Sequence, residues 1–195
     1  SISVNTPGSY FVTVTDINGC SATSSTTIVN IITPTNTGLV FHENIGTVSA
    51  TTSIATHETN NGFESDSLTM SGTGDVRITA TSNGYTDASG GANVFLTNTV
   101  GRTFIISGIN TIGRSNLLLS FGLSRSNTAV NGSELQVRYS TDGVNYISLT
   151  ITPITSTASW TYITVAGSIP QTSNLRLQFR QNGTSSQYRI DDISL

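Results

Sequence analysis

The sequence predicts an all-β protein whose main part is an antiparallel β-sandwich of the jelly-roll type. Segments that alternate apolar and polar side chains recur along the 195 residues, and no segment shows a convincing helical period. The clearest segments are "NLLLSFGLS", "ELQVRYS" and "NLRLQFR", which each place their apolar side chains on one face, as half-buried strands do. Roughly ten strands separated by turn dipeptides are typical of an antiparallel sandwich.

The other candidate strands follow one another along the same part of the chain. They are "LVFHE", "SLTMS", "DVRITA", "NVFLTN", "TFIISG", "VNYISLT" and "WTYITV". Residues 45–66 carry little periodicity, and we expect them to cross between the two sheets.

In the last segment, "YRIDDISL", the apolar side chains switch from one side of the strand to the other in the middle. Ile190 points to one side of the strand, whereas Ile193 and Leu195 point to the other, because successive side chains of a strand alternate. One extra residue would repair this mismatch, so we expect a β-bulge at Asp191 and Asp192. Such a bulge sets two carboxylates side by side, where a cation or an arginine can neutralise them.

Residues 1–33 have a different pattern. A short strand, "ISVN", precedes two long ones around a turn at residues 16–19. An immunoglobulin-like sandwich needs about seven strands, so this segment is either the C-terminal part of such a repeat or an extension docked on the next domain. We expect residues 34–37 to form a linker and residues 38–195 to form the jelly-roll module.

Composition narrows the class of protein. Only 10% of the residues are charged, every basic residue is an arginine, and the net charge is −3. A nucleic-acid-binding protein needs clustered positive charge, and no such run occurs. No apolar run approaches the ~18 residues of a membrane span. The chain has no signal-peptide pattern, so we expect the targeting segment elsewhere in a longer protein, and the single Cys20 does not indicate a redox compartment.

Two stretches resemble known families of modules. "GSYFVTVTDINGCSATSSTTI" resembles the closing strands of adhesin-type repeats in large secreted proteins of Bacteroidetes. The remainder, with "SGGANVFLTN", "SNLLLSFGL" and "ELQVRYSTDGVNY", is similar to a jelly-roll module that recurs in the same multidomain proteins. The resemblance implies a secreted or cell-surface location, cargo of type IX secretion, and further domains of the same long chain as partners.

The ending also resembles carbohydrate-binding jelly rolls with a structural calcium. In those modules an acidic residue of the first strand and an aspartate of the last strand hold the ion, which implies Glu43 with Asp191 or Asp192 here. Carboxylate oxygens are ligands that Ca²⁺ prefers. The alternative is an ion pair with Arg189 or another arginine. Asp75 is a further candidate ligand, with a turn-capping role as the alternative.

The two histidines do not indicate a metal or catalytic centre. His42 and His57 have no cysteine or third histidine beside them, whereas a zinc site needs three or four ligands. We expect both side chains to be solvated or locally hydrogen-bonded. A Ser-His-Asp triad stays open on residue types alone, although no Gly-x-Ser-x-Gly motif occurs.

Arginine and glutamine side chains indicate a binding surface. Strand alternation places Gln136 and Arg138, and also Arg176, Gln178 and Arg180, away from the core. If their two strands share a sheet, the five form one polar surface suited to sugar hydroxyls, carboxylates or sulfates. The alternative is an ordinary solvated face. Aromatic rings that can stack on sugars are those of Tyr85, Tyr146, Trp160 and Tyr162, with a core position as the alternative for Trp160.

These features predict a non-catalytic module that binds a polysaccharide or surface glycan, and we expect an anionic glycan rather than a neutral one. The competing interpretation is a spacer that binds only its metal. Ser67 in "DSL" resembles the acceptor of a short O-glycosylation motif of Bacteroidetes exported proteins. The chain has few carboxylates for the two-acid chemistry of glycoside hydrolysis, so we expect no enzyme activity.

Overall fold

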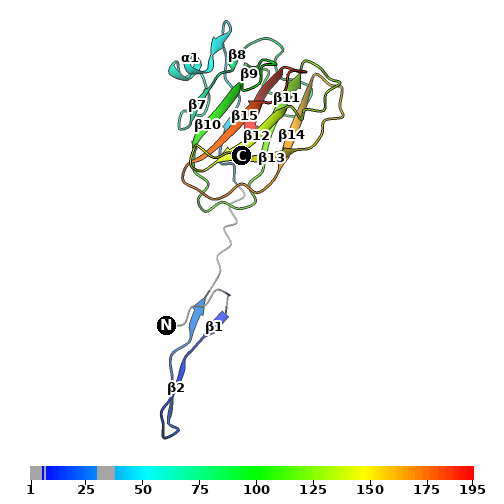
Figure 1. Ribbon diagram of the computed structural model, residues 1–195. Coiled ribbons are helices and arrows are strands. Elements are labelled where there is room, and N and C mark those ends of the chain that lie inside the picture. Colours follow the sequence, from blue (N-terminus) through cyan, green and yellow to red (C-terminus); the bar gives the residue numbers. More distant parts are fainter. Residues whose placement is uncertain (1–5, 7, 30–37) are drawn as a thin grey trace. The chain divides into compact units, whose positions relative to one another are not determined.

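The computed structural model describes residue 6, residues 8–29 and residues 38–195. The chain divides into two compact units, Ser1–Thr35 and Asn36–Leu195 (Figure 1). Each unit is described by itself.

The second unit is almost entirely made of strands. They are β5 (His42–Glu43), β6 (Thr52–Ser53), β7 (Thr69–Gly72), β8 (Asp75–Arg77), β9 (Asn93–Leu96), β10 (Thr103–Ile109), β11 (Leu119–Arg125), β12 (Leu135–Ser140), β13 (Ile147–Ile151), β14 (Trp160–Ala166), β15 (Leu175–Gln181) and β16 (Tyr188–Ser194). Every segment in this unit for which the sequence predicts a strand contributes one. The two-residue strand β6 was not predicted.

The strands pair antiparallel in the order β6-β8-β9-β16-β11-β14-β13-β12-β15-β10-β7, and β5 also pairs with β16. Strand β13 pairs with both β12 and β14, so the two layers of the sandwich join along this edge. The prediction of an all-β antiparallel sandwich is confirmed.

The core lies between the layers and is built by alternation. Strand β11 buries Leu119, Phe121 and Leu123, and β15 on the opposite layer buries Leu175, Leu177 and Phe179. The Phe121 and Phe179 rings meet edge to face at 5.0 Å between centroids. Each large apolar side chain buried in this way contributes about 2 kcal/mol of transfer free energy, which fixes which face of each strand remains outside.

One short helix in the described part of the chain corrects the prediction of a helix-free chain. Helix α1 (Ile54–Thr59) lies in the stretch that was expected only to cross between sheets. Ser53 caps it by accepting a hydrogen bond from the Thr56 amide at 3.0 Å. Six residues are too few to show a 3.6-residue period in a sequence, which is why the pattern gave no sign of it.

The strands of residues 8–29, in the first unit, form two small antiparallel ribbons. Strands β1 (Gly8–Tyr10) and β4 (Thr27–Val29) pair, as do β2 (Thr13–Thr15) and β3 (Ser21–Thr23). The predicted turn at residues 16–19 is present, since the Asp16 carboxylate accepts hydrogen bonds from the backbone amides of Asn18 and Cys20. The "ISVN" segment and the linker at residues 34–37 lie outside the described residues.

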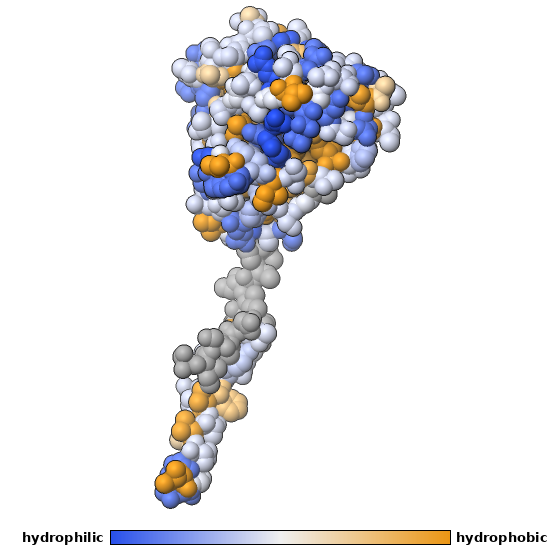
Figure 2. Space-filling view, in the orientation of Figure 1, coloured by the Kyte–Doolittle hydropathy of each residue, from blue (hydrophilic) through white to orange (hydrophobic). Residues whose placement is uncertain are grey.

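Apolar side chains of these ribbons face solvent. Phe11, Val14, Ile17 and Ile28 are each more than 60% exposed, and hydrophobic colour is visible on this unit in Figure 2. A two-stranded ribbon cannot bury such side chains by itself. The assignment to an immunoglobulin-like repeat stays a prediction.

In the part of the chain that the structure describes, no helix has the length and apolar character needed to cross a membrane.

Candidate functional site

The last strand contains the predicted bulge. Along β16 and β11, Ser194 pairs with Ser120 and Asp191 pairs with Gly122, so β16 has one residue more than its partner between these points. Asp192 adopts a left-handed backbone with φ 49° at this place. The bulge restores the inward direction of Ile193 and puts two acidic side chains next to each other.

Both carboxylates are buried and are held by protein donors. Asp191 accepts a hydrogen bond from the Ser89 hydroxyl at 3.1 Å, and Asp192 accepts one from the Tyr85 hydroxyl and another from the Ser89 amide at 3.2 Å. Burial, followed by the charge of Asp192, raises the pKa of Asp191 to about 7, although hydroxyl hydrogen bonds act against this. Burial and the hydrogen bond to Asp192 raise the pKa of Tyr85 well above its usual value.

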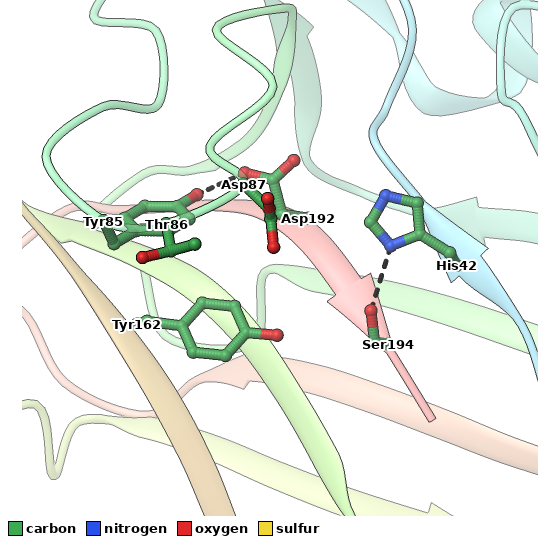
Figure 3. A pocket seen from close by; sticks show the side chains of 7 residues that line it. All are labelled: His42, Tyr85, Thr86, Asp87, Tyr162, Asp192 and Ser194. Atoms are coloured by element: carbon green, nitrogen blue, oxygen red, sulfur yellow. Dashed lines mark hydrogen bonds between the residues drawn. The ribbon is translucent and has the colours of Figure 1, made fainter. Parts of the chain in front are cut away.

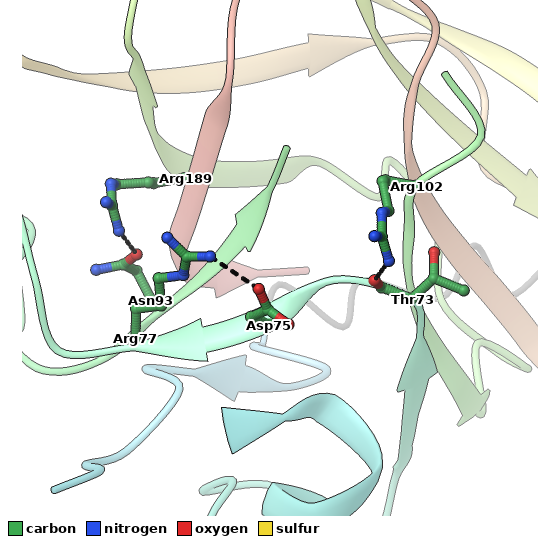
Figure 4. A network of polar contacts seen from close by, with 6 residues as sticks. All are labelled: Thr73, Asp75, Arg77, Asn93, Arg102 and Arg189. Atoms are coloured by element: carbon green, nitrogen blue, oxygen red, sulfur yellow. Dashed lines mark hydrogen bonds and ion pairs between the residues drawn. The ribbon is translucent and has the colours of Figure 1, made fainter. Parts of the chain in front are cut away.

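The proposed ion pair with Arg189 is wrong. The Arg189 guanidinium donates to the Asn93 side-chain oxygen at 2.8 Å (Figure 4). It also lies over the Phe95 ring, 4.7 Å from its centroid. Its side chain leaves the strand on the side of Phe95, and a cation–π contact holds it there.

Glu43 ties the first strand of the module to the last. It pairs with Ile193 across β5 and β16, which confirms that these strands are neighbours. Its buried carboxylate accepts hydrogen bonds from the backbone amides of Ile45, Glu64 and Ser65, with N···O distances of 2.8–3.0 Å. Burial raises the pKa of Glu43 above its usual value, although the three amide hydrogen bonds act in the opposite direction.

The four predicted calcium ligands do not gather around one point. Among the described residues, no group of three or more His, Cys, Asp or Glu side chains is placed to hold a metal. Asp75 forms an ion pair with Arg77 at 2.9 Å (Figure 4), and its role as a metal ligand stays a prediction. Asp191 and Asp192 have the oxygen chemistry that Ca²⁺ prefers, and calcium there stays a prediction.

The five predicted ligand-binding residues do share one face of one sheet. Strand β12 pairs with β15 so that Gln136 lies opposite Arg180 and Arg138 lies opposite Gln178. Arg176 lies opposite Ser140 in the same register. The five side chains lie on the face opposite the core, where Gln178 is nevertheless buried beneath its neighbours. We call the surface formed by Gln136, Arg138, Arg176, Gln178 and Arg180 the arginine face.

Contacts with neighbouring side chains hold two guanidinium groups of the arginine face in place. Arg138 donates to the Gln178 oxygen and lies over the Tyr146 ring at 5.3 Å. Arg180 donates to the Asn182 oxygen at 2.9 Å and more weakly to Gln136 at 3.4 Å. These partners are neutral, so the face keeps its positive charge.

The arginine face has no ion-pair partner among the described residues. In the described residues the only ion pair is that of Asp75 and Arg77, which lies elsewhere. Burial and the nearby charge of Arg180 lower the pKa of Arg138. Gly143 makes room for the third guanidinium, because a Cβ there would lie 1.2 Å from Arg176 Nη1. An anion on this face would relieve the repulsion between its arginines.

A loop crosses the outer surface of the other layer. Residues 78–92, which we call the strap loop, connect β8 to β9. The buried Trp160 donates from its indole nitrogen to the Ala80 carbonyl at 3.2 Å, so its ring anchors the loop and is not a free stacking surface. Tyr85 lies over Gly122, where a Cβ would approach its hydroxyl to 2.0 Å.

The strap loop and the sheet beneath it enclose a pocket with a volume of about 550 Å³. We call it the tyrosine pocket; it is lined by His42, Tyr85, Thr86, Asp87, Tyr162, Asp192 and Ser194. Figure 3 shows the rings of Tyr85 and Tyr162 on one side, His42 with Ser194 on the other, and the two aspartates between them.

Both histidines are locally hydrogen-bonded, as predicted. His42 Nδ1 lies 2.9 Å from the Ser194 hydroxyl, and the buried His57 contacts the Ile45 carbonyl through Nε2 at 2.8 Å. The Asp192 carboxylate accepts a hydrogen bond from Tyr85, whereas His42 is hydrogen-bonded to Ser194 (Figure 3). The three residue types of a hydrolytic triad are therefore close together here without forming the ordered chain that a triad needs.

Ser67 is exposed in a turn closed by the Leu68 amide and the Ser65 carbonyl at 3.0 Å. Its hydroxyl is accessible, and its modification stays a prediction.

The sequence reasoning missed the tyrosine pocket as a unit. It identified Tyr85 and Tyr162 separately but not Asp87, and it expected nothing of His42 and Ser194 together. The available signal was an aromatic residue inside "SNGYTDASGG", a stretch otherwise typical of a solvated turn.

Known structures resemble this chain at low identity. The K2 cleaved adhesin domain of Lys-gingipain shares 14% identity with a TM-score of 0.49, and the match covers 79% of this chain and 96% of that domain. The CBM22-1 xylan-binding domain of Paenibacillus barcinonensis Xyn10C shares 11% identity with a TM-score of 0.41, over 80% and 92% of the two chains. TmCBM61, solved with β-1,4-galactotriose, shares 15% with a TM-score of 0.36, over 65% and 85%. No protein-family model and no curated protein sequence matches the chain.

Proposed function

We propose that the chain is a non-catalytic glycan-binding module and that an anionic glycan binds to its arginine face. One observation carries this proposal. The register of β12 and β15 brings three guanidiniums and two amides together on one sheet surface, without a carboxylate partner among the described residues.

Guanidinium groups suit this ligand class for a geometric reason. Each presents a planar array of N–H donors that matches a carboxylate or sulfate with two parallel hydrogen bonds. Residues two apart on a strand are ~7 Å apart, and adjacent strands are ~4.8 Å apart, so the face offers a grid of donors. Gln136 adds a donor and an acceptor for sugar hydroxyls, whereas the buried Gln178 holds Arg138 in place.

A location outside the cell, beside other domains of the same long chain, belongs to the same proposal. It is supported by the absence of lysine and by the many serine, threonine and asparagine side chains. The exposed apolar side chains of the first unit, including Phe11 and Ile28, suit contact with a neighbouring domain.

A glycan array with neutral and anionic polymers, including polygalacturonate and dextran sulfate, tests the proposal. We expect the wild type to bind at least one polyanion. The change Arg138→Ala/Arg180→Ala should weaken this binding at least tenfold, and Arg114→Ala, which removes a charge outside the arginine face, should not. Absence of binding by the wild type would favour the spacer function. Equal binding by the double variant would remove the ligand from the arginine face.

A further inference from the structure

The tyrosine pocket has the size and position of a ligand site. It opens at the surface of the layer that does not carry the arginine face, and its volume of about 550 Å³ is within the ~300–1,000 Å³ of small-ligand sites. Its walls come from the strap loop, β5, β14 and β16. Segments distant in the sequence therefore converge on it.

Two tyrosine rings form its apolar wall. The centroids of Tyr85 and Tyr162 are 5.4 Å apart with 35° between the planes. Tyr162 is 44% exposed, and its hydroxyl lies 2.9 Å from that of Ser120, which fixes the ring. Tyr85 is fixed by its hydrogen bond to Asp192. A held aromatic face can cover the C–H face of a sugar ring at little cost in conformational entropy.

Polar groups opposite the rings can bind hydroxyls. Asp87 is exposed and lines the pocket, and its carboxylate makes no hydrogen bond or ion pair within the described residues. A carboxylate accepts hydrogen bonds from two neighbouring hydroxyls at once. His42 and Ser194, joined at 2.9 Å, offer further donors and acceptors across the pocket (Figure 3).

The charge of the pocket selects among sugars. Asp87 and Asp192 line it, and no arginine does. Carboxylates or sulfates on a ligand would be repelled by these two groups. The preference is thus opposite to that of the arginine face.

We propose that the tyrosine pocket is a second binding site and that it takes an uncharged sugar unit with adjacent free hydroxyls. In this site Tyr85 and Tyr162 stack on the ring, and Asp87 accepts hydrogen bonds from its hydroxyls. Asp192 is a positioning residue that holds Tyr85, because it is itself only 2% exposed.

Titration of the chain with neutral oligosaccharides of glucose, galactose, xylose and mannose tests this site. Tyr162→Ala should weaken binding about tenfold, which corresponds to the ~1.4 kcal/mol of one aromatic stacking contact. Tyr162→Phe keeps the ring and should bind within about twofold of the wild type, and Asp87→Asn should weaken binding severalfold. Ile147→Ala is a matched control, since it truncates an exposed apolar side chain outside the pocket.

These variants test the two proposed sites independently. Arg138→Ala/Arg180→Ala should leave the affinity for neutral sugars unchanged, and Tyr162→Ala should leave the affinity for polygalacturonate unchanged. Lack of binding to every neutral oligosaccharide would overturn the second site. So would a Tyr162→Ala variant, with a melting temperature like that of the wild type, that binds them as well as the wild type does.

Discussion

Asp191 is a carboxylic acid at a fully buried position of a β-strand, with hydroxyl and amide donors around it and no ion pair among the described residues. Its pKa of about 7 lies far above the value of 3.8 for an unperturbed aspartate. Between these values the folded chain binds the proton and the unfolded chain does not. The contribution of Asp191 to stability is therefore present at low pH and is lost as pH rises through this window.

We expect the free energy of unfolding, measured in EDTA, to fall by up to about 4 kcal/mol across that window because of Asp191. Asp191→Asn should remove most of this slope, since the amide is neutral in both states. Urea titrations at several pH values measure the effect. A slope that persists unchanged in the asparagine variant would show that another group causes it.

Calcium at the acidic pair has its own test. A metal that binds only the folded chain stabilises it by mass action, so we expect EDTA to lower the melting temperature of the wild type. Asp192→Ala should melt at the same temperature with and without EDTA. If EDTA leaves the wild type unchanged, the tyrosine and serine donors alone hold these carboxylates.

At the scale of elements, the strap loop depends on the absence of a side chain at Gly122 in β11. A Cβ there would lie 2.0 Å from the Tyr85 hydroxyl, which Asp192 also holds. Gly122→Ala should therefore destabilise the chain by about 1–3 kcal/mol, the usual cost of overpacking. Thermal melts measure the loss, which should be much smaller when Tyr85→Ala is also present. Equal losses in both backgrounds would show that the two residues do not compete for space.

Strands were predictable from the sequence, but the strap loop was not. A half-buried strand such as β15 can be recognised from its own residues, because one of its two faces must be apolar. The bulge was predictable for the same reason, since Ile190 and Ile193 could not otherwise both face the core. Tyr85 and Tyr162 meet only because a loop without periodicity crosses the sheet, and no local pattern records such a crossing.

The whole molecule has its core in one of its two units. Every residue of the buried apolar cluster, and each partly buried one packed against it, lies between Val40 and Leu195. A chain that begins at residue 38 should therefore melt within a few degrees of the full chain. Differential scanning calorimetry measures both. A large loss of stability would show that the first unit contributes to the fold of the second.

We propose two binding surfaces of opposite charge, one on each layer of this sandwich. The sequence predicted the arginine face, because strand alternation alone fixes which side chains point outward and only the pairing of β12 with β15 remained open. It could not predict the tyrosine pocket, because that pocket depends on the position of the strap loop. It also did not predict the ion pair of Asp75 with Arg77.

The salt dependence of glycan affinity tests the central claim most directly. Titrations of the wild type and of Arg138→Ala/Arg180→Ala with polygalacturonate should be made at low salt and near 0.15 M, where charges separated by more than about 8 Å are screened. We predict that the wild type binds more tightly at low salt and that the double variant loses both affinity and salt dependence. Wild-type binding that is independent of salt, or no binding at either concentration, would contradict the claim that the arginine face binds an anionic glycan.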